Sequence, residues 1–421
     1  MAQVDRISTE HVTYVVDEVT PGAHPGSGDV RARVNLDVNL ASGIARETLP
    51  NNRDSAYRHD NAPHVLGKAT PKLPALTWNV CGIPSAQRLD ASVTPSVLSH
   101  DVLFRHGFGR RYAAQGCTVG SGSTTTSIVV DDSTGRIAGE LVTFVLSGVR
   151  YVRRITEVVD GTTFTVAPAL PGSPSNGDVV TACRTFVLAE QRSATLAISH
   201  KRGGPTGEEY RLLGCFGSLK LNFPGHGQII TASLEGGAIS SVGPVANGGL
   251  SAPSFGSTDP ADDDMDGPLV FFSRLYIDGT ETRYEPGSLK VELMQRPEEV
   301  PDGSTDSGIG GWLDTGGRDN GVAVTIEFTT RVDQARPAVF DAGTVQHLAF
   351  MVDPGNDTGL ALEVARAQLI ERPVPVQLGQ AREGMTHKYK ALLDTLPTLA
   401  GSPPNAEARD LGRAPIRLGL W

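Results

Sequence analysis

The chain contains little of what marks disulfide-rich, metal-binding or membrane-spanning proteins. Its 421 residues include only four cysteines, and these show no short paired spacing, so the expected state of each is a buried free thiol. They are Cys81, Cys117, Cys183 and Cys215. No apolar run approaches the roughly 20 residues of a membrane-spanning helix. Residues 1–30 also lack the charged and then apolar layout of a secretory signal. We therefore expect synthesis inside the cell and no membrane anchor.

Positive charge is scarce as well. Lysine and arginine number 37 against 47 aspartates and glutamates, which gives a formal net charge of −10. Proteins that grip nucleic acid need clustered basic side chains to displace counterions, and anionic membrane surfaces attract the same clusters. The composition therefore argues against both partners.

Glycine and proline are abundant instead, at 48 and 28 residues, while apolar residues make up 39%. This mixture suits many short strands joined by turns better than it suits long helices. A chain of this length exceeds one ordinary core, so two or three domains are expected. The sequence thus predicts a mainly β protein with more than one β unit.

Changes in periodicity divide the chain into segments. We predict an N-terminal arm at 1–29 and a first β unit in two pieces, 30–106 and 185–246, with an inserted outer β domain at 107–184 between them. A linker at 247–267, a second β unit at 268–396 and an extended C-terminal segment at 397–421 follow. The insert contains five short β-rich runs with turn signals between them, which is typical of a small barrel or sandwich. The run at 386–396 is compatible with a strand or a short helix.

The stretch GSLKLNFPGHGQIITASLEG, at residues 217–236, predicts a β-hairpin. Alternation places Leu219, Leu221 and Phe223 on one face and Lys220 and Asn222 on the other. The PGHG segment supplies turn residues, and the returning strand is again apolar at every second position. One face of this hairpin must be buried against another layer.

Part of this hairpin recurs seventy residues later. GSLKL at 217–221 returns as GSLKV at 287–291, and each copy is followed by a turn-rich connection and a second alternating strand. We interpret the pair as an internal duplication of one β unit. Chance remains the competing explanation for so short a match.

The strongest candidate for a chemical site is DDDMDG. Asp262, Asp264 and Asp266 followed by Gly267 match the opening of a calcium loop, where oxygen ligands recur at every second residue. The twelfth position is Ser273, however, where a bidentate glutamate is needed. A solvated acidic linker is the better interpretation, and the three aspartates remain only weak metal-ligand candidates.

Other motifs give no active site. GSGSTTTS at 120–127 lacks the Gly-Lys-Ser/Thr ending of a phosphate-binding loop, and there is no G-x-S-x-G nucleophile elbow. RHGFGRRY at 105–112 is the densest basic patch, and interdomain ion pairs suit it better than a phosphate backbone. We therefore expect no enzymatic activity and no cofactor.

Three segments resemble the tail tube proteins of long-tailed bacteriophages. They are residues 208–236, the repeat GSLKVEL at 287–293 and residues 359–379. The insert at 107–184 looks like the small β domain that several such proteins carry outside the tube. The resemblance covers residues 30–390 and is carried by the order of strands rather than by invariant motifs. It implies a β-sandwich that assembles into rings, with inner sheets joining across subunits around a lumen.

The same resemblance implies the partners and the location. Stacked rings would form the tube of the virion tail, assembled in the host cytoplasm. DNA and the tape-measure protein would pass through the lumen without specific binding, and tail terminator and distal tail proteins would contact its ends. A duplicated chain would form a trimer that imitates six-fold symmetry, and an unduplicated one a hexamer. Lys220, Asn222, Lys290 and Glu292 are then candidates for the lumen or for subunit contacts.

We also expect the N-terminal arm and residues 41–72 to contact neighbouring subunits or the next ring. Deleting residues 1–28 is predicted to impair polymerisation and leave the β core folded. Carboxylates facing a lumen would keep DNA from adhering to it.

Other functions remain open at this stage. A distal tail or baseplate ring protein would share the fold. A carbohydrate-binding adhesin would need exposed aromatic platforms, for which 6% aromatic residues give thin support. A metal-dependent hydrolase built on the three aspartates would need a histidine or glutamate partner that the sequence does not place. A calcium titration of thermal stability would separate the metal-binding alternatives from a structural protein.

Overall fold

The structure is a computed structural model of the chain. It describes residues 12–18, 20, 22–23, 32–34, 44–49, 65–80, 101–113, 115–188, 195–202, 208–246, 269, 273–285, 287–293, 297–302, 309–314, 324–331, 336–353, 358–377, 383–395 and 411–421. Most of these residues lie in antiparallel β-strands, and the labelled helices α2 and α3 are short. The prediction of a mainly β fold is confirmed.

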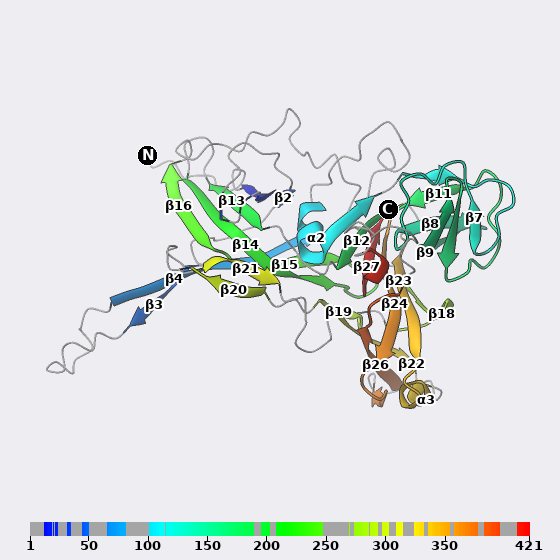
Figure 1. Cartoon of the computed structure of the whole chain (residues 1–421). Coiled ribbons are helices and arrows are strands. Elements are labelled where there is room, and N and C mark those ends of the chain that lie inside the picture. Colours follow the sequence, from blue (N-terminus) through cyan, green and yellow to red (C-terminus); the bar gives the residue numbers. More distant parts are fainter. Residues whose placement is uncertain are drawn as a thin grey trace, which may run out of the picture.

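The first β unit is built around one long strand (Figure 1). Its strands are β1 Val12–Asp17, β2 Ala32–Val34, β3 Ile44–Leu49, β4 Val65–Asn79, β13 Leu196–Arg202, β14 Glu208–Asn222, β15 Thr231–Gly237 and β16 Ser240–Ala246. The first half of β14 pairs with β13 and β16, and its second half pairs with β15. The predicted hairpin of β14 and β15 is confirmed, and Leu219, Leu221 and Phe223 are buried.

β14 changes partners at a glycine. Gly214 has φ +64°, and a Cβ there would lie 2.4 Å from Ile239 Cδ1. Its N–H donates to the buried Glu18 carboxylate at 2.9 Å, which also accepts from Thr195 Oγ1 at 2.6 Å. Burial raises the pKa of Glu18, although these hydrogen bonds partly oppose the shift. Only glycine combines this backbone conformation with so close an approach.

The second β unit continues the same sheet and shares one core cluster with the first. It contains β17 Ser273–Ile277, β18 Thr280–Thr282, β19 Lys290–Leu293, β22 Val324–Arg331, α3 Arg336–Asp341, β23 Val345–Val352, β24 Leu360–Leu369, β25 Pro375–Gln377 and β26 Glu383–Ala391. Residues 386–396 were predicted to form either a strand or a short helix; up to Ala391 they belong to strand β26.

A separate hairpin of the second unit reaches back onto the first. Its strands are β20 Pro297–Pro301 and β21 Ile309–Asp314. Trp312 of β21 donates its indole N–H to Gly214 O at 2.7 Å and stacks on Phe216, with ring centroids 6.2 Å apart. This contact ties the two units together beside the bend in β14.

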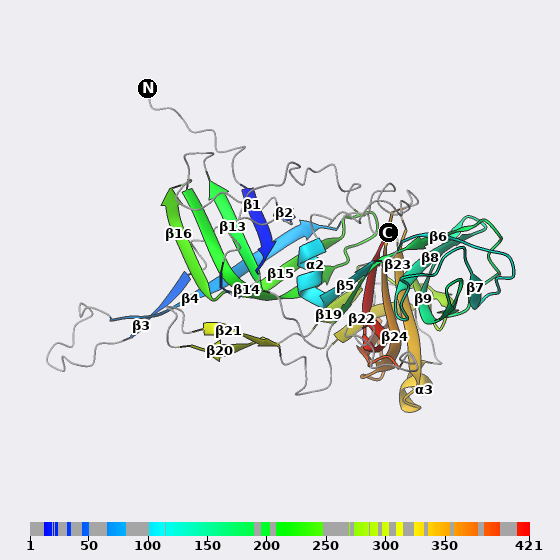
Figure 2. The ribbon, with the colours of Figure 1, turned by 45° about the horizontal axis from the view of Figure 1, so that its top comes forward.

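The insert forms its own six-stranded sheet, at the end of the molecule away from β3 and β16 (Figures 1 and 2). Its strands, in sheet order, are β6 Cys117–Thr118, β11 Val179–Ala182, β8 Leu141–Leu146, β9 Val149–Asp160, β10 Thr163–Ala167 and β7 Ser127–Val129. A core of its own includes Phe144, Ile155 and Phe164. These strands fall within the range predicted for the inserted domain.

The chain enters and leaves the insert through two paired strands of the main sheet. β5 Gly109–Ala113 and β12 Arg184–Leu188 are antiparallel neighbours, with Arg184 opposite Ala113. Residues 109–113, predicted as part of the insert, thus belong to the main sheet. Because entry and exit lie side by side, the insert fits without interrupting the sheet.

The terminal segments differ from the prediction. Within the predicted arm, β1 pairs with β13 and β2, and Val15 is fully buried. Within the predicted C-terminal extension, β27 Arg417–Leu420 lies between β12 and β24, and Trp421 is fully buried. The extended-arm prediction is wrong for these strands. Deleting residues 1–28 would remove the core strand β1. The β core is therefore no longer expected to stay intact after that deletion.

One helix packs against the core of the first unit (Figure 2). α2 Asp101–Phe108 buries Leu103, Phe104 and Phe108, and the Phe104 ring contacts those of Trp78 and Phe186 at centroid distances of 5.7 and 5.4 Å. The three apolar positions share one face at helical spacing. This helix was not predicted.

Candidate functional site

The two copies of the GSLK sequence lie next to each other. β14 pairs with β19, with Leu221 opposite Val291. Six neighbouring strands result, in the order β4, β15, β14, β19, β22 and β26, which we call the shared sheet. Each β unit contributes three of them, so the central pair joins the two units.

The register relates the two halves of the shared sheet by a local two-fold axis. One row of mutually opposite residues crosses all six strands: Trp78, Ala232, Leu221, Val291, Ile326 and Tyr389. Every side chain in this row is buried. Leu221 and Val291 occupy the same position in the two copies of the repeated sequence. An aromatic residue, Trp78 or Tyr389, stands at each end of the row. The hairpins β14–β15 and β19–β22 follow the same chain order, as an internal duplication would give. The outer strands do not, because β4 precedes its hairpin and β26 follows its own.

The four residues predicted for lumen or subunit contacts are brought together on the opposite, polar face of the shared sheet. Lys220 lies opposite Glu292, and Asn222 lies opposite Lys290. All four are exposed. Because side chains alternate across a strand, burial of Leu221 and Val291 forces these neighbours outward.

Exposed ion pairs and hydrogen bonds cross the polar face. Lys220 Nζ lies 2.7 Å from Glu235 Oε2, and Lys290 Nζ lies 3.1 Å from Glu327 Oε1. Thr325 donates to Glu292 Oε2 at 3.4 Å. The face therefore carries both signs of charge. Such pairs fix side-chain positions but add little stability in water.

No group of three or more His, Cys, Asp or Glu side chains that could hold a metal ion occurs in the described parts of the chain. The candidate ligands Asp262, Asp264 and Asp266 lie outside the described residues. What the described part of the face offers chemically is an exposed array of paired lysine and glutamate side chains.

The described cysteines are free and buried, as predicted. They are Cys117, Cys183 and Cys215, whereas Cys81 lies outside the described residues. Burial raises the pKa of all three thiols. A thiol held neutral in this way is a poor nucleophile.

A buried ionic network missed by the sequence analysis lies where the insert meets the second unit. Glu363 contacts Arg417 at 3.0 Å, Arg154 at 3.4 Å and His347 Nε2 at 3.1 Å, and Asp394 contacts both arginines at 2.7 Å. Burial alone raises the pKa of Glu363, but the two guanidinium groups and the His347 contact hold it far below its usual range. The network links the insert, β24 and the C-terminal strand.

No helix among the residues that the structure describes is long and apolar enough to cross a membrane. No family model matches the chain, and no curated protein is significantly similar to it.

Proposed function

We propose that this chain is a structural subunit that assembles with copies of itself into stacked rings, which form the tail tube of a long-tailed bacteriophage. The observation that carries the proposal is the shared sheet, to which each β unit contributes three strands, with a buried apolar row on one face and exposed charged residues on the other. A sheet of this kind suits the wall of a conduit, because barrel closure between subunits removes exposed strand edges.

The polar face is assigned to the lumen in this proposal. Two of its lysines form ion pairs with glutamates, Lys220–Glu235 and Lys290–Glu327, which lowers the unpaired positive charge that would face a passing phosphate backbone. Specific DNA binding needs the opposite arrangement, with clustered cations that displace counterions. DNA and the tape-measure protein would thus slide past without being held.

The insert would lie outside the tube, because it joins the molecule through β5 and β12, which are not strands of the shared sheet, and lies at one end of the molecule (Figure 1). With two equivalent units in each chain, a ring of three chains would imitate six-fold symmetry. Assembly in the host cytoplasm, location in the virion tail and contacts with tail terminator and distal tail proteins follow from the same proposal.

Electron microscopy of the concentrated recombinant chain in negative stain tests self-assembly. We expect stacked rings or tubes whose top views contain three subunits, each with two lobes. Six separate subunits per ring would contradict the role given to the duplication. A chain that stays monomeric would favour a binding module instead.

Thiol labelling tests which face lines the lumen. Asn222→Cys places a thiol on the polar face, and the matched control Glu157→Cys places one on an exposed position of β9 in the insert. With a maleimide on a polymer too bulky to enter the tube, we expect labelling of the first variant to fall on assembly and that of the control to persist. Equal labelling of the two variants in tubes would contradict the assignment.

A distal tail or baseplate ring protein is the second candidate, because a ring that does not stack would use the same sheet. Single rings without tubes in the micrographs would favour it. A carbohydrate-binding adhesin is less well supported, since the exposed large apolar side chains in the described parts of the chain are aliphatic rather than aromatic.

A further inference from the structure

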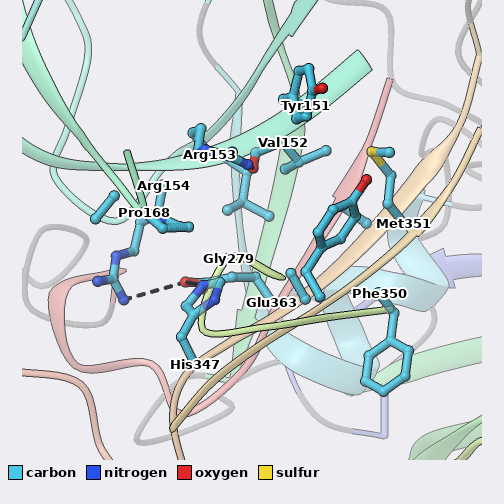
Figure 3. Close-up of a pocket in the computed structure, with 15 residues that line it drawn as sticks. Tyr151, Val152, Arg153, Arg154, Pro168, Gly279, His347, Phe350, Met351 and Glu363 are labelled. Carbon is cyan, nitrogen blue, oxygen red and sulfur yellow. Dashed lines mark hydrogen bonds and ion pairs between the residues drawn. The ribbon is translucent and has the colours of Figure 1, made fainter. Parts of the chain in front are cut away.

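A cleft lies between the inserted sheet and the second β unit (Figure 3). Its walls come from β9, from the turn after β10, from the turn between β17 and β18, and from β23 and β24. The cleft is small and opens to solvent, so only a compact ligand could enter it. Apolar groups such as Val152, Pro168, Phe350 and Met351 form much of the lining.

Arg153 is the unusual polar group of this cleft. Its side chain is only 9% exposed, yet its hydrogen-bond acceptors are two backbone carbonyls, Val152 O at 2.7 Å and Ala169 O at 3.3 Å. Its Nε is buried without a hydrogen-bond partner, and no described carboxylate lies within ion-pair distance of it. Burial of an arginine without a counter-charge is unfavourable, because the guanidinium loses its hydration.

Neighbouring buried arginines are arranged differently. Arg154, the next residue, forms ion pairs with Glu363 and Asp394, and the dashed line in Figure 3 marks its contact with Glu363. Arg150 lies 3.8 Å from Asp353, and Arg136 is paired with Glu140. The fold thus supplies carboxylates to arginines on either side of Arg153. Burial without such a partner lowers the pKa of Arg153 to about 10.

Aromatic rings flank the unpaired guanidinium. Arg153 lies over the Tyr151 ring, 5.4 Å from its centroid, and Tyr276 lines the same cleft. The negative charge of Glu363, elsewhere in the lining, is already balanced by Arg154 and Arg417, so it does not oppose an anion at the Arg153 position.

We propose that the cleft binds a small organic carboxylate with a compact apolar or aromatic body. The carboxylate would accept hydrogen bonds from the Arg153 guanidinium, and the body would lie against the apolar lining. A bidentate pair between a guanidinium and a carboxylate is among the stronger polar contacts in proteins, and it would supply the counter-charge that the fold leaves out. This site is independent of ring assembly.

Benzoate is a suitable probe, with benzamide as its neutral counterpart of the same shape. In ligand-observed NMR titrations of the full chain we expect saturable benzoate binding below about 10 mM and binding of benzamide at least about tenfold weaker. No saturation by benzoate, or equal affinity for the two compounds, would overturn the proposal without any variant.

Arg153→Met removes the charge and keeps an apolar side chain, and Arg372→Met makes the same change at an exposed arginine outside the cleft. We expect the first variant to lose benzoate binding by about tenfold or more and the second to keep it. Arg153→Lys, which retains a cation, should bind benzoate better than Arg153→Met. Benzoate affinity unchanged in Arg153→Met would show that Arg153 only braces the two backbone carbonyls.

Discussion

Each β unit contributes three strands to the shared sheet, but the two sets of strands are supported differently. Beneath the first unit, α2 buries Leu103, Phe104 and Phe108, whereas α3 of the second unit has no buried residue. In the second unit the support is aromatic stacking, with Phe328 parallel to Tyr389 at a centroid distance of 5.7 Å. The parts that match are the paired hairpins and their exposed polar residues.

The outer edges of the shared sheet differ as well. The outer edge of β26 is paired with β25 and with the end of β24. Along β4, no described strand pairs with the outer edge between Lys72 and Thr77. Each chain therefore brings unlike edges to its two sides. Such edges suit a head-to-tail contact, which generates a closed ring rather than a symmetric dimer.

Removing the aromatic residues that end the buried row should give the largest effect. Trp78→Ala and Tyr389→Ala each leave a large cavity under the shared sheet, and we expect each to lower the free energy of unfolding by about 3–5 kcal/mol. Urea denaturation of both variants is the measurement. If the units are equivalent, the two losses should agree within about 1 kcal/mol. A loss confined to one variant would break the equivalence.

The change of pairing partners along β14 at Gly214 is a feature of the first unit. Gly214→Ala combines a positive φ with a Cβ 2.4 Å from Ile239 Cδ1, so we expect the free energy of unfolding to fall by about 3 kcal/mol, measured by urea denaturation. Gly227→Ala is the matched control, because φ is +79° there but nothing lies within 4 Å of the added Cβ. That variant should lose about 1 kcal/mol. Equal losses would mean that the close approach to Ile239 contributes nothing.

The insert and the main body should respond to pH in opposite directions. Burial raises the pKa of Glu140 to about 7, despite its ion pair with Arg136. Its contribution to stability is complete below its unfolded pKa of 4.5 and is lost as pH rises through about 7. Glu363 has a lowered pKa, so its contribution is present above 4.5 and is lost at more acid pH.

Glu140→Gln tests this contrast. The wild-type chain should lose of order 2 kcal/mol between pH 4.5 and pH 8 through this group, and the variant should not. Thermal unfolding followed by circular dichroism over that range would measure the difference. An identical pH dependence of the two proteins would show that Glu140 is ionised at every pH in the range.

Local alternation was enough to predict the hairpin and to place Lys220 and Asn222 on the face opposite its apolar side chains. It could not predict that the two copies pair, because β14 and β19 carry no local sign of their partner. The network around Glu363 was out of reach for the same reason, since Arg154 and Asp394 are 240 residues apart.

Other misses did have a signal in the sequence. The C-terminal PIRLGLW alternates at Ile416, Leu418 and Leu420, as a strand with one apolar face does, but proline and arginine nearby favoured an extended segment. α2 is only eight residues long and contains Gly107, so its helical period was too short to recognise. Short elements are defined by what they pack against rather than by their own pattern.

The smallest effect is expected on the polar face itself. Lys220→Ala and Lys290→Ala each remove one exposed ion pair, whose lysine side chains are 60% and 65% exposed, and each should change stability by less than about 1 kcal/mol. Urea denaturation of both variants, at low and high salt, measures this. A loss above about 2 kcal/mol in either would show that the face is not open to water in the isolated chain. If the face is open to water, the two lysines contribute little to stability. Tube formation by the double variant Lys220→Ala, Lys290→Ala then measures whether they contribute to assembly.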